Sequence, residues 1–281
     1  MSAGQSLTEA DHRRVAMFME RMAGIQLPAH KRTLIETRLR RRLRETAKAS
    51  MREYLDFALS PAGEAGEQVL LIDALTTNKT DFFREPAHFQ YLERVVRDEL
   101  APRADLGWRQ PLMVWSAACS SGEEPYTLAI VLRELEAELP GFRFQIDATD
   151  IARSVLATAR SGVYRSDRIA PVPEALRRRY FLRSRDPAKG LVKMGPALKS
   201  VIEFYEFNLI TGDYPAKPRY DVIFCRNVMI YFNGADRERI IAQLRASLRP
   251  GGLLFIGHSE SIGNQRTGFE SLIPTVYRRV D

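Results

Sequence analysis

Cysteine is nearly absent from the 281-residue sequence, and long apolar runs are absent altogether. Cys119 and Cys225 share no metal-binding spacing and are too few for a disulfide scaffold, which favours a reducing compartment. No apolar run approaches the about 18 residues of a membrane span. Residues 1–12 lack the basic and then apolar segments of a secretory signal. We therefore expect a cytoplasmic protein without membrane insertion.

Histidine is also scarce. The four histidines are scattered along the chain, and no two of them stand at a spacing typical of metal ligands. On this ground the sequence predicts no metal site. Internal repeats and polar low-complexity tracts are absent too, while apolar residues make up 45% of the chain. A folded core is therefore expected rather than disorder.

Acidic residues are too few to balance the basic ones. Lysine and arginine number 42 against 35 acids, which gives a net charge of +7. Residues 31–52 hold nine basic and two acidic residues, so this one segment accounts for the whole excess. Such a concentration of positive charge indicates an anionic partner without identifying it.

The first 85 residues show helical patterns and no strand pattern. Thr8 is placed as a helix N-cap, Gly24 as a helix end, and Ser50 with Glu53 as a capping box for a later helix. We predict an all-α N-terminal domain with its linker over residues 1–85.

A basic helix is predicted within this domain, over about residues 29–48. Ile35, Leu39 and Leu43 recur every fourth residue and would form its buried face. The arginines between them are then expected to be mostly exposed and available for docking a partner: Arg38, Arg41, Arg42 and Arg44.

Residues 86–281 read as a second domain, in which strands alternate with helices. Apolar runs at 112–115, 142–148, 220–225 and 253–257 predict strands, with helices between them. This alternation predicts an α/β fold with a doubly wound, parallel, Rossmann-like sheet. The run at 275–280 is expected to add an edge strand.

The alternation is interrupted by an arginine-rich stretch. Residues 191–194 and 201–204 have the pattern of short antiparallel strands. We predict a small antiparallel β insert over about residues 165–206.

The segment from Ser116 to Tyr126 follows the first strand and opens a helix, where α/β sheets bind ligands. Small residues there allow a ligand to approach the backbone. Glu123 and Glu124 at the helix start would repel a pyrophosphate, which favours a phosphate-free or cationic ligand. The alternative is that these acids only stabilise the helix N-terminus.

Two further strand ends carry polar side chains. Asp150 ends the second strand, where nucleoside-binding sheets accept hydrogen bonds from ribose hydroxyls; the alternative is a helix N-cap. The run from Cys225 to Phe232 follows a later strand and would project Arg226, Asn227 and Tyr231 into the same crevice. The alternative is that Asn227 and Tyr231 are buried structural residues.

Taken together, these strings resemble the chemotaxis receptor glutamate methyltransferases, the CheR family, which use S-adenosylmethionine. The resemblance covers nearly the whole chain, and its strings occur in the family's order. They are residues 76–85, 115–126, 148–151, 208–209 and 225–232.

The resemblance implies a helical domain, a linker that carries part of the cofactor site, and a methyltransferase domain with a β insert. It implies a set of S-adenosylmethionine-binding residues: Asn78, Thr80, Arg84, Glu123, Asp150, Asn208, Leu209, Arg226 and Asn227. It also implies that Arg84 and Tyr231 lie nearest the transferred methyl group and position the acceptor.

A glutamate acceptor agrees with the residues available. Its carboxylate is ionised at neutral pH, with a reference pKa of about 4.3, so it needs no general base. Amine methyltransferases carry an Asn/Asp-Pro-Pro-aromatic string at the corresponding strand end. Here residues 227–230 read Asn-Val-Met-Ile, which disfavours an amine acceptor.

The expected partners are the acidic methylation helices of chemotaxis receptors, docked on the basic helix. Some members of the family also hold a receptor C-terminal peptide at the insert, and the sequence leaves this open. A nucleic-acid methyltransferase is the alternative suggested by the pI of about 9.5, although no RNA-binding signature accompanies it. A non-catalytic cofactor-binding module would be expected to lack Arg84 or Tyr231, and both are present.

Overall fold

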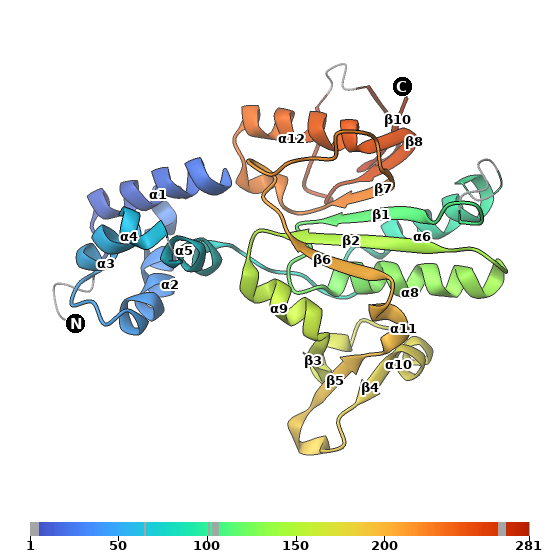
Figure 1. Cartoon of the computed structure of the whole chain (residues 1–281), viewed down its shortest axis with the longest axis horizontal. Coiled ribbons are helices and arrows are strands. Elements are labelled where there is room, and N and C mark those ends of the chain that lie inside the picture. The colour runs from blue at the N-terminus through green and yellow to red at the C-terminus, as the bar shows by residue number, and fades with distance from the viewer. Residues whose placement is uncertain (1–5, 65, 101, 103–106, 264–267, 281) are drawn as a thin grey trace.

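The computed structural model describes residues 6–64, 66–100, 102, 107–263 and 268–280. Within these residues a helical domain lies beside an α/β domain, and an extended segment joins the two (Figure 1). The helical domain contains only helices, as predicted: α1 (Glu9–Ala23), α2 (Arg32–Glu45), α3 (Met51–Ala58), α4 (Pro61–Glu64) and α5 (Glu67–Leu75).

The helix ends form where the sequence placed them. The Thr8 hydroxyl accepts the Asp11 N–H at 3.1 Å and caps α1. Gly24 ends α1 in the left-handed conformation, with φ of 68°. A Cβ on Gly24 would lie 2.5 Å from the Cδ1 atom of Ile210 in the other domain, so only glycine fits both the helix end and the domain contact. The Ser50 hydroxyl accepts the Glu53 N–H at 3.1 Å and caps α3, as predicted, but the Glu53 carboxylate accepts the N–H of Ala49 rather than that of Ser50, so the capping box is only partly formed.

The predicted basic helix is shorter than expected. A 3₁₀ turn at Ala29–Lys31 precedes α2, and the helix ends at Glu45, beyond which Ala47 has φ of 51°. Its apolar face is as predicted, because Ile35, Leu39 and Leu43 are all buried in the core of the helical domain.

The α/β domain is built on a seven-stranded sheet in the order β6-β2-β1-β7-β8-β10-β9. The first five strands are parallel, and β10 and β9 are antiparallel to their neighbours. The strands are β1 (Leu112–Ala117), β2 (Phe144–Asp150), β6 (Ile202–Glu206), β7 (Tyr220–Cys225), β8 (Leu248–Phe255), β9 (Phe269–Ile273) and β10 (Val276–Arg279). The predicted Rossmann-like α/β fold is confirmed.

Two strand predictions were wrong. The terminal strand β10 is not an edge strand, because β9, which the sequence analysis missed, pairs outside it. The strand over residues 202–206 does not belong to the insert, because β6 pairs in parallel with β2 and extends the main sheet. Both errors concern long-range pairing, which local patterns do not encode.

Helices cover both faces of the sheet, and successive side chains of β1 point alternately into the cores on the two faces. Leu112 and Val114 face a core shared with α6 (Pro86–Val95) and α8 (Glu123–Glu138). Met113 and Trp115 point to the other face, where α12 (Gly234–Ser247) covers the sheet. A π-helical turn (Val96–Leu100) follows α6, and α9 (Arg153–Ser161) packs on β2 and β6.

The insert is a separate three-stranded antiparallel sheet below the main domain (Figure 1). Its strands are β3 (Val163–Arg165), β4 (Phe181–Arg183) and β5 (Leu191–Met194). The short helix α10 (Glu174–Tyr180) lies between β3 and β4, and α11 (Pro196–Lys199) leads from β5 to β6 of the main sheet; 3₁₀ turns form at Ser166–Ile169 and Pro187–Lys189.

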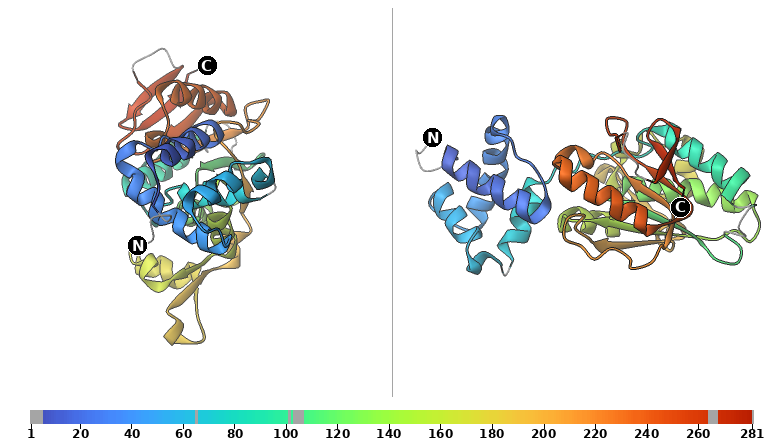
Figure 2. Two further views of the ribbon diagram at one scale, coloured as in Figure 1. Left: turned by 90° about the vertical axis from the view of Figure 1, so that its left-hand side faces the viewer. Right: turned by 90° about the horizontal axis from the view of Figure 1, so that it is seen from above.

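Figure 2 shows the helical domain at one end of the α/β domain, the end at which β1, β2 and β7 finish. The Gln26 N–H donates to the Tyr231 carbonyl at 2.9 Å, and the Asn208 side-chain amide donates to the Met22 carbonyl at 2.7 Å. These bonds tie the end of α1 to the α/β domain. Among the described residues, no helix is both long and apolar enough to span a membrane.

Candidate functional site

A cavity lies between the two domains, at the carboxyl ends of the parallel strands. The linker, the end of α1, the start of α2 and the loops after β1, β2 and β7 all contribute to its wall. Nine of the residues implied by the family resemblance line it together: Asn78, Thr80, Arg84, Asp150, Asn208, Leu209, Arg226, Asn227 and Tyr231. Segments far apart in the sequence thus meet at one site.

The loop after β1 brings backbone close to the cavity. Ala118, Ser120 and Gly122 all have positive φ, at 60°, 51° and 97°. This tight loop places Ala118, Cys119 and Ser120 in the cavity wall. The Ser120 hydroxyl donates to the Asn78 carbonyl at 3.0 Å, which ties the loop to the linker.

Asp150 is a buried carboxylate at the end of β2. Its two oxygens accept the Ser120 N–H at 2.8 Å and the Ala152 N–H at 2.9 Å, so its orientation is fixed. Burial raises the pKa of Asp150, while these backbone donors act in the opposite direction. The residue at the N-cap of α9 is Ala152, so Asp150 is not that helix's cap residue. Each carboxylate oxygen has a second lone pair, which can accept a hydrogen bond from a ligand hydroxyl.

The two acids at the start of α8 are separated by the structure. Glu123 does not line the cavity; its carboxylate pairs with Arg168 at 2.6 Å and accepts the Ser121 hydroxyl. Glu124 lines the cavity instead, and burial raises its pKa. Glu124 is thus the lining residue of the two, and cofactor binding by Glu123 stays a prediction. Successive helical residues point about 100° apart, and the sequence alone did not distinguish them.

The linker is held from both sides. Arg38 of α2 donates to the Leu75 and Thr76 carbonyls, both at 2.9 Å, and to the Thr77 hydroxyl at 3.3 Å. Arg168 donates to the Thr80 carbonyl at 2.5 Å. These bonds fix the backbone that presents Asn78, Thr80 and Arg84 to the cavity.

Arg226 is a buried cation beneath the linker, with 1% of its side chain exposed. It donates to the Arg84 carbonyl at 2.5 Å and lies 3.1 Å from Glu85 and 3.4 Å from Glu124. Phe89 and Phe224 stack against the guanidinium. Arg226 therefore joins the linker to the end of β7 and neutralises two buried acids.

The segment from Asn227 to Tyr231 is positioned by Glu260. This buried carboxylate accepts the N–H groups of Asn227 at 2.8 Å, Met229 at 2.7 Å and Gly257 at 2.6 Å. Asn227 has φ of 58° and donates its side-chain amide to Glu85. The loop conformation that puts Tyr231 in the cavity wall is thus held by backbone bonds. The sequence analysis missed Glu260, which the run Gly257-His258-Ser259-Glu260 could have flagged.

Two of the four docking arginines are not exposed as predicted. Arg38 lines the cavity and binds the linker. Arg42 has 14% of its side chain exposed and binds Glu67 with two hydrogen bonds of 3.0 and 2.7 Å. Both lie beside the apolar face of α2, which packs on α5. Arg41 and Arg44 are exposed, as expected.

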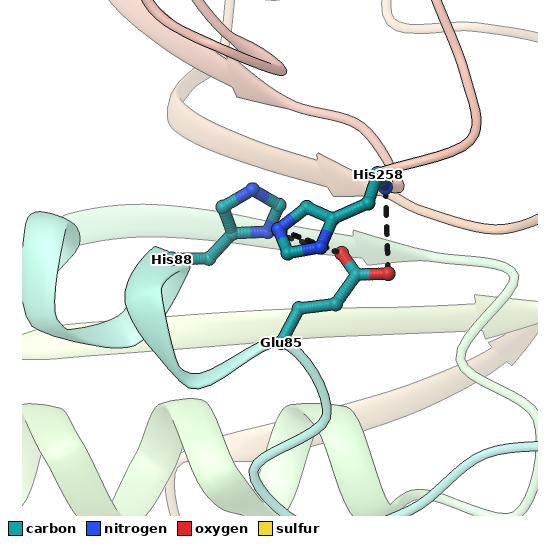
Figure 3. Close-up of side chains that lie close together, drawn as sticks. All are labelled: Glu85, His88 and His258. Atoms are coloured by element: carbon teal, nitrogen blue, oxygen red, sulfur yellow. Dashed lines mark hydrogen bonds and ion pairs between the residues drawn. The ribbon is translucent and has the colours of Figure 1, made fainter.

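The histidine spacing was also misleading, because His88 and His258 are neighbours in space. Their ring centroids lie 5.0 Å apart, and the Glu85 carboxylate lies beside the two rings (Figure 3). Burial and the Arg226 guanidinium lower the pKa of His88 to about 4, although Glu85 acts in the opposite direction. Burial opposes ionisation of Glu85, but Arg226 and Asn227 outweigh it and lower its pKa. The cysteines are both buried and free, as expected.

Comparison with known proteins gives matches over nearly the whole chain. Residues 10–76 match the family described as CheR methyltransferase, all-alpha domain, and residues 78–277 match CheR methyltransferase, SAM binding domain. Chemotaxis protein methyltransferase 2 of Pseudomonas aeruginosa is 40% identical over 96% of this chain and 93% of its own. The chemotaxis protein methyltransferases of Escherichia coli and Salmonella typhimurium are 38% and 40% identical, each over 99% of this chain and 93% and 92% of their own.

Proposed function

The chain belongs to the CheR family of chemotaxis methyltransferases, which depend on S-adenosylmethionine, and we propose that it methylates glutamate side chains of chemotaxis receptors. The product would be a glutamyl methyl ester. The observation that carries this proposal is the cavity wall itself, which contains the carboxylates of Asp150 and Glu124 together with Arg84 and Tyr231.

The carboxylate side fits the cofactor. S-adenosylmethionine is cationic at sulfur, has ribose hydroxyls and lacks phosphate, and it supplies an activated methyl group. Asp150 and Glu124 line the cavity and can accept hydrogen bonds from hydroxyl and ammonium groups. We assign cofactor binding to Asn78, Thr80, Arg84, Glu123, Asp150, Asn208, Leu209, Arg226 and Asn227, and we add Glu124, which lines the cavity.

The acceptor side fits a carboxylate. The Arg84 guanidinium and the Tyr231 hydroxyl can both donate hydrogen bonds to a glutamate oxygen. The described residues that line the cavity include no histidine, and an ionised glutamate needs no general base. Alignment of the attacking oxygen and exclusion of water would then provide most of the acceleration. Arg84 and Tyr231 are our assignment for that role.

The exposed cations of α2 fit the receptor. Arg41 and Arg44 remain available after Arg38 and Arg42 are assigned to internal contacts, and we propose that they attract the acidic methylation helices in the cytoplasm. A receptor C-terminal peptide is a second contact that we propose for the insert, where Arg177, Arg178 and Arg183 line a hollow.

The chemical nature of the product tests the proposal. Transfer of tritiated methyl groups to receptor-containing membranes should give label that alkali releases as volatile methanol. Label that resists alkali would indicate an N-methyl product and contradict the proposal. RNA as the substrate in a parallel reaction tests the nucleic-acid alternative, and we expect no transfer to it.

Asp150→Asn tests the cofactor side. Loss of the charge should weaken S-adenosylmethionine binding by roughly 1–3 kcal/mol, the scale of a hydrogen bond to a charged group. Calorimetry measures the affinity, and circular dichroism checks that the variant is folded. Unchanged affinity in a folded variant would remove Asp150 from the cofactor site.

Tyr231→Phe tests the acceptor side. The hydroxyl is proposed to orient the acceptor, so turnover should fall more than cofactor affinity does. Methyl transfer at saturating cofactor and calorimetry give the two quantities separately. A variant with normal turnover would make Tyr231 a structural residue.

A further inference from the structure

A cluster of three metal-ligating side chains lies beside the cofactor cavity. Glu85 directly precedes α6, His88 lies in the first turn of that helix, and His258 follows the end of β8. Their side chains point toward one another, as Figure 3 shows, and one donor atom from each lies within 4.8 Å of the other two. We propose that this cluster binds a divalent transition-metal ion of the Zn²⁺ class.

The donor set selects the class of ion. Two imidazoles and one carboxylate are a common ligand combination for Zn²⁺, whereas Mg²⁺ and Ca²⁺ prefer oxygen ligands throughout. Glu85 stands three residues before His88, and its carbonyl accepts the His88 backbone N–H at 3.1 Å, which keeps the two residues close together.

The separations are close to those that a tetrahedral ion requires. The Nδ1 atom of His88 lies 3.5 Å from the Oε2 atom of Glu85, and the Nε2 atom of His258 lies 3.9 Å from the same oxygen. Ligands on a zinc ion at about 2.0–2.1 Å lie roughly 3.3 Å apart. His258 has 56% of its side chain exposed, so it can rotate to complete the approach.

Two buried atoms at the centre of the cluster lack hydrogen-bond partners. These are the Nδ1 atom of His88 and the Oε2 atom of Glu85, and the His88 side chain is 1% exposed. Buried polar atoms are rarely left without a partner. A bound cation would give the Nδ1 atom of His88 a partner, whereas the Oε2 atom of Glu85 already lies 3.1 Å from the Arg226 guanidinium.

The surroundings hold the ligands in the orientation that binding needs. The Thr275 hydroxyl donates to the Pro274 carbonyl at 2.6 Å and is therefore an acceptor for the Nε2–H of His88 at 2.8 Å. That bond leaves the lone pair on Nδ1 facing Glu85. The other oxygen of Glu85 accepts the Asn227 amide at 3.2 Å and the His258 N–H at 3.4 Å.

Arg226 opposes the ion and sets its expected affinity. Its guanidinium lies 3.1 Å from the Oε2 atom of Glu85 and also approaches Glu124. A nearby positive charge weakens the binding of a divalent cation. The site should therefore bind Zn²⁺ more weakly than a structural zinc site does, and exchange it with chelators.

Direct metal binding tests the proposal on the full chain. After removal of metals with a chelator, calorimetric titration with Zn²⁺ should show one ion bound per chain. His258→Ala should weaken binding by roughly 100-fold, and Thr275→Val by roughly 10-fold, the scale of lost outer-shell support. His30→Ala, which alters an exposed histidine of the helical domain, is the matched control and should bind as the wild type does.

Cobalt gives an independent readout. Co²⁺ bound by nitrogen and oxygen ligands should show visible absorption bands of a four-coordinate ion, without the charge-transfer bands of thiolate ligation. Absence of a bound ion, or equal Zn²⁺ affinity in the wild type and His258→Ala, would overturn the proposal.

Discussion

The inner and outer sides of α2 carry the same chemical group in different surroundings. On the inner side, Arg38 holds the linker and Arg42 holds Glu67. On the outer side, Arg41 and Arg44 are exposed, and Arg41 pairs with Glu45 of its own helix. Two arginines thus assemble the cavity and its domain, and two remain to face a partner.

The difference follows from position on the helix. Successive residues turn by about 100°, so Arg42 and Arg38 lie next to the apolar stripe, whereas Arg41 and Arg44 lie opposite it. A count of charged residues along the sequence predicts that all four arginines are exposed. The angular position around the helix distinguishes the two pairs, because only the arginines next to the apolar stripe can reach neighbouring segments.

Arg42→Ala should show the largest effect of the series, and it concerns stability. The substitution leaves Glu67, which is 8% exposed, with only the Tyr54 hydroxyl from the described contacts. Removing one partner of a buried pair costs about 3–5 kcal/mol. Urea unfolding measures the loss.

The matched control is Arg41→Ala on the outer side, which should change stability by less than about 0.5 kcal/mol. Arg42→Ala/Glu67→Gln should recover part of the loss, because no unpaired charge remains. Equal free energies of unfolding for the Arg41 and Arg42 variants would contradict the prediction that only the inner side of α2 stabilises the fold.

Arg38→Ala should show the next largest effect, on cofactor binding. Three hydrogen bonds to Leu75, Thr76 and Thr77 are lost, and the linker that presents Asn78, Thr80 and Arg84 loosens. We expect S-adenosylmethionine binding to weaken by roughly 1–2 kcal/mol, about 10-fold. Calorimetry measures it, with Arg44→Ala as the control that keeps normal affinity. Normal affinity in Arg38→Ala would mean that the linker holds its conformation without α2.

Arg41→Ala/Arg44→Ala should show the smallest effect, confined to the receptor. Two exposed charges contribute roughly 1 kcal/mol, so the apparent KM for receptor should rise by about fivefold while cofactor affinity stays constant. The rate should also depend less on salt, because fewer ionic contacts remain to be screened. A normal KM at both low and moderate salt would make the outer side a solvated surface only.

Elements with strong local signals could be predicted from the sequence. The cap at Thr8, the helix end at Gly24 and the capping box at Ser50 depend on neighbours within a few residues. The partner of β6 could not be predicted in this way, since its pairing with β2 joins segments more than fifty residues apart. The same holds for β9, whose position outside β10 is set by tertiary packing.

The cavity shows a similar division. Strand ends at Asp150 and Arg226 converge because parallel strands finish at one edge, which the alternation of strands and helices predicts. Which of Glu123 and Glu124 lines the cavity depends on the rotation of α8, which brings Glu123 to Arg168. The proximity of His88 to His258 depends on how α6 packs against the end of β8. Neither is a property of spacing along the chain.

Gly24 lies at the contact between the two domains and has no room for a side chain. It ends α1 at positive φ, and the space a side chain would need there is filled by Ile210 and Phe232 of the other domain. A replacement at this position requires compensating changes on both sides of the seam at once. The helical domain of a relative therefore cannot be exchanged freely for this one, and chimeras joined within the linker should inherit a mismatched contact.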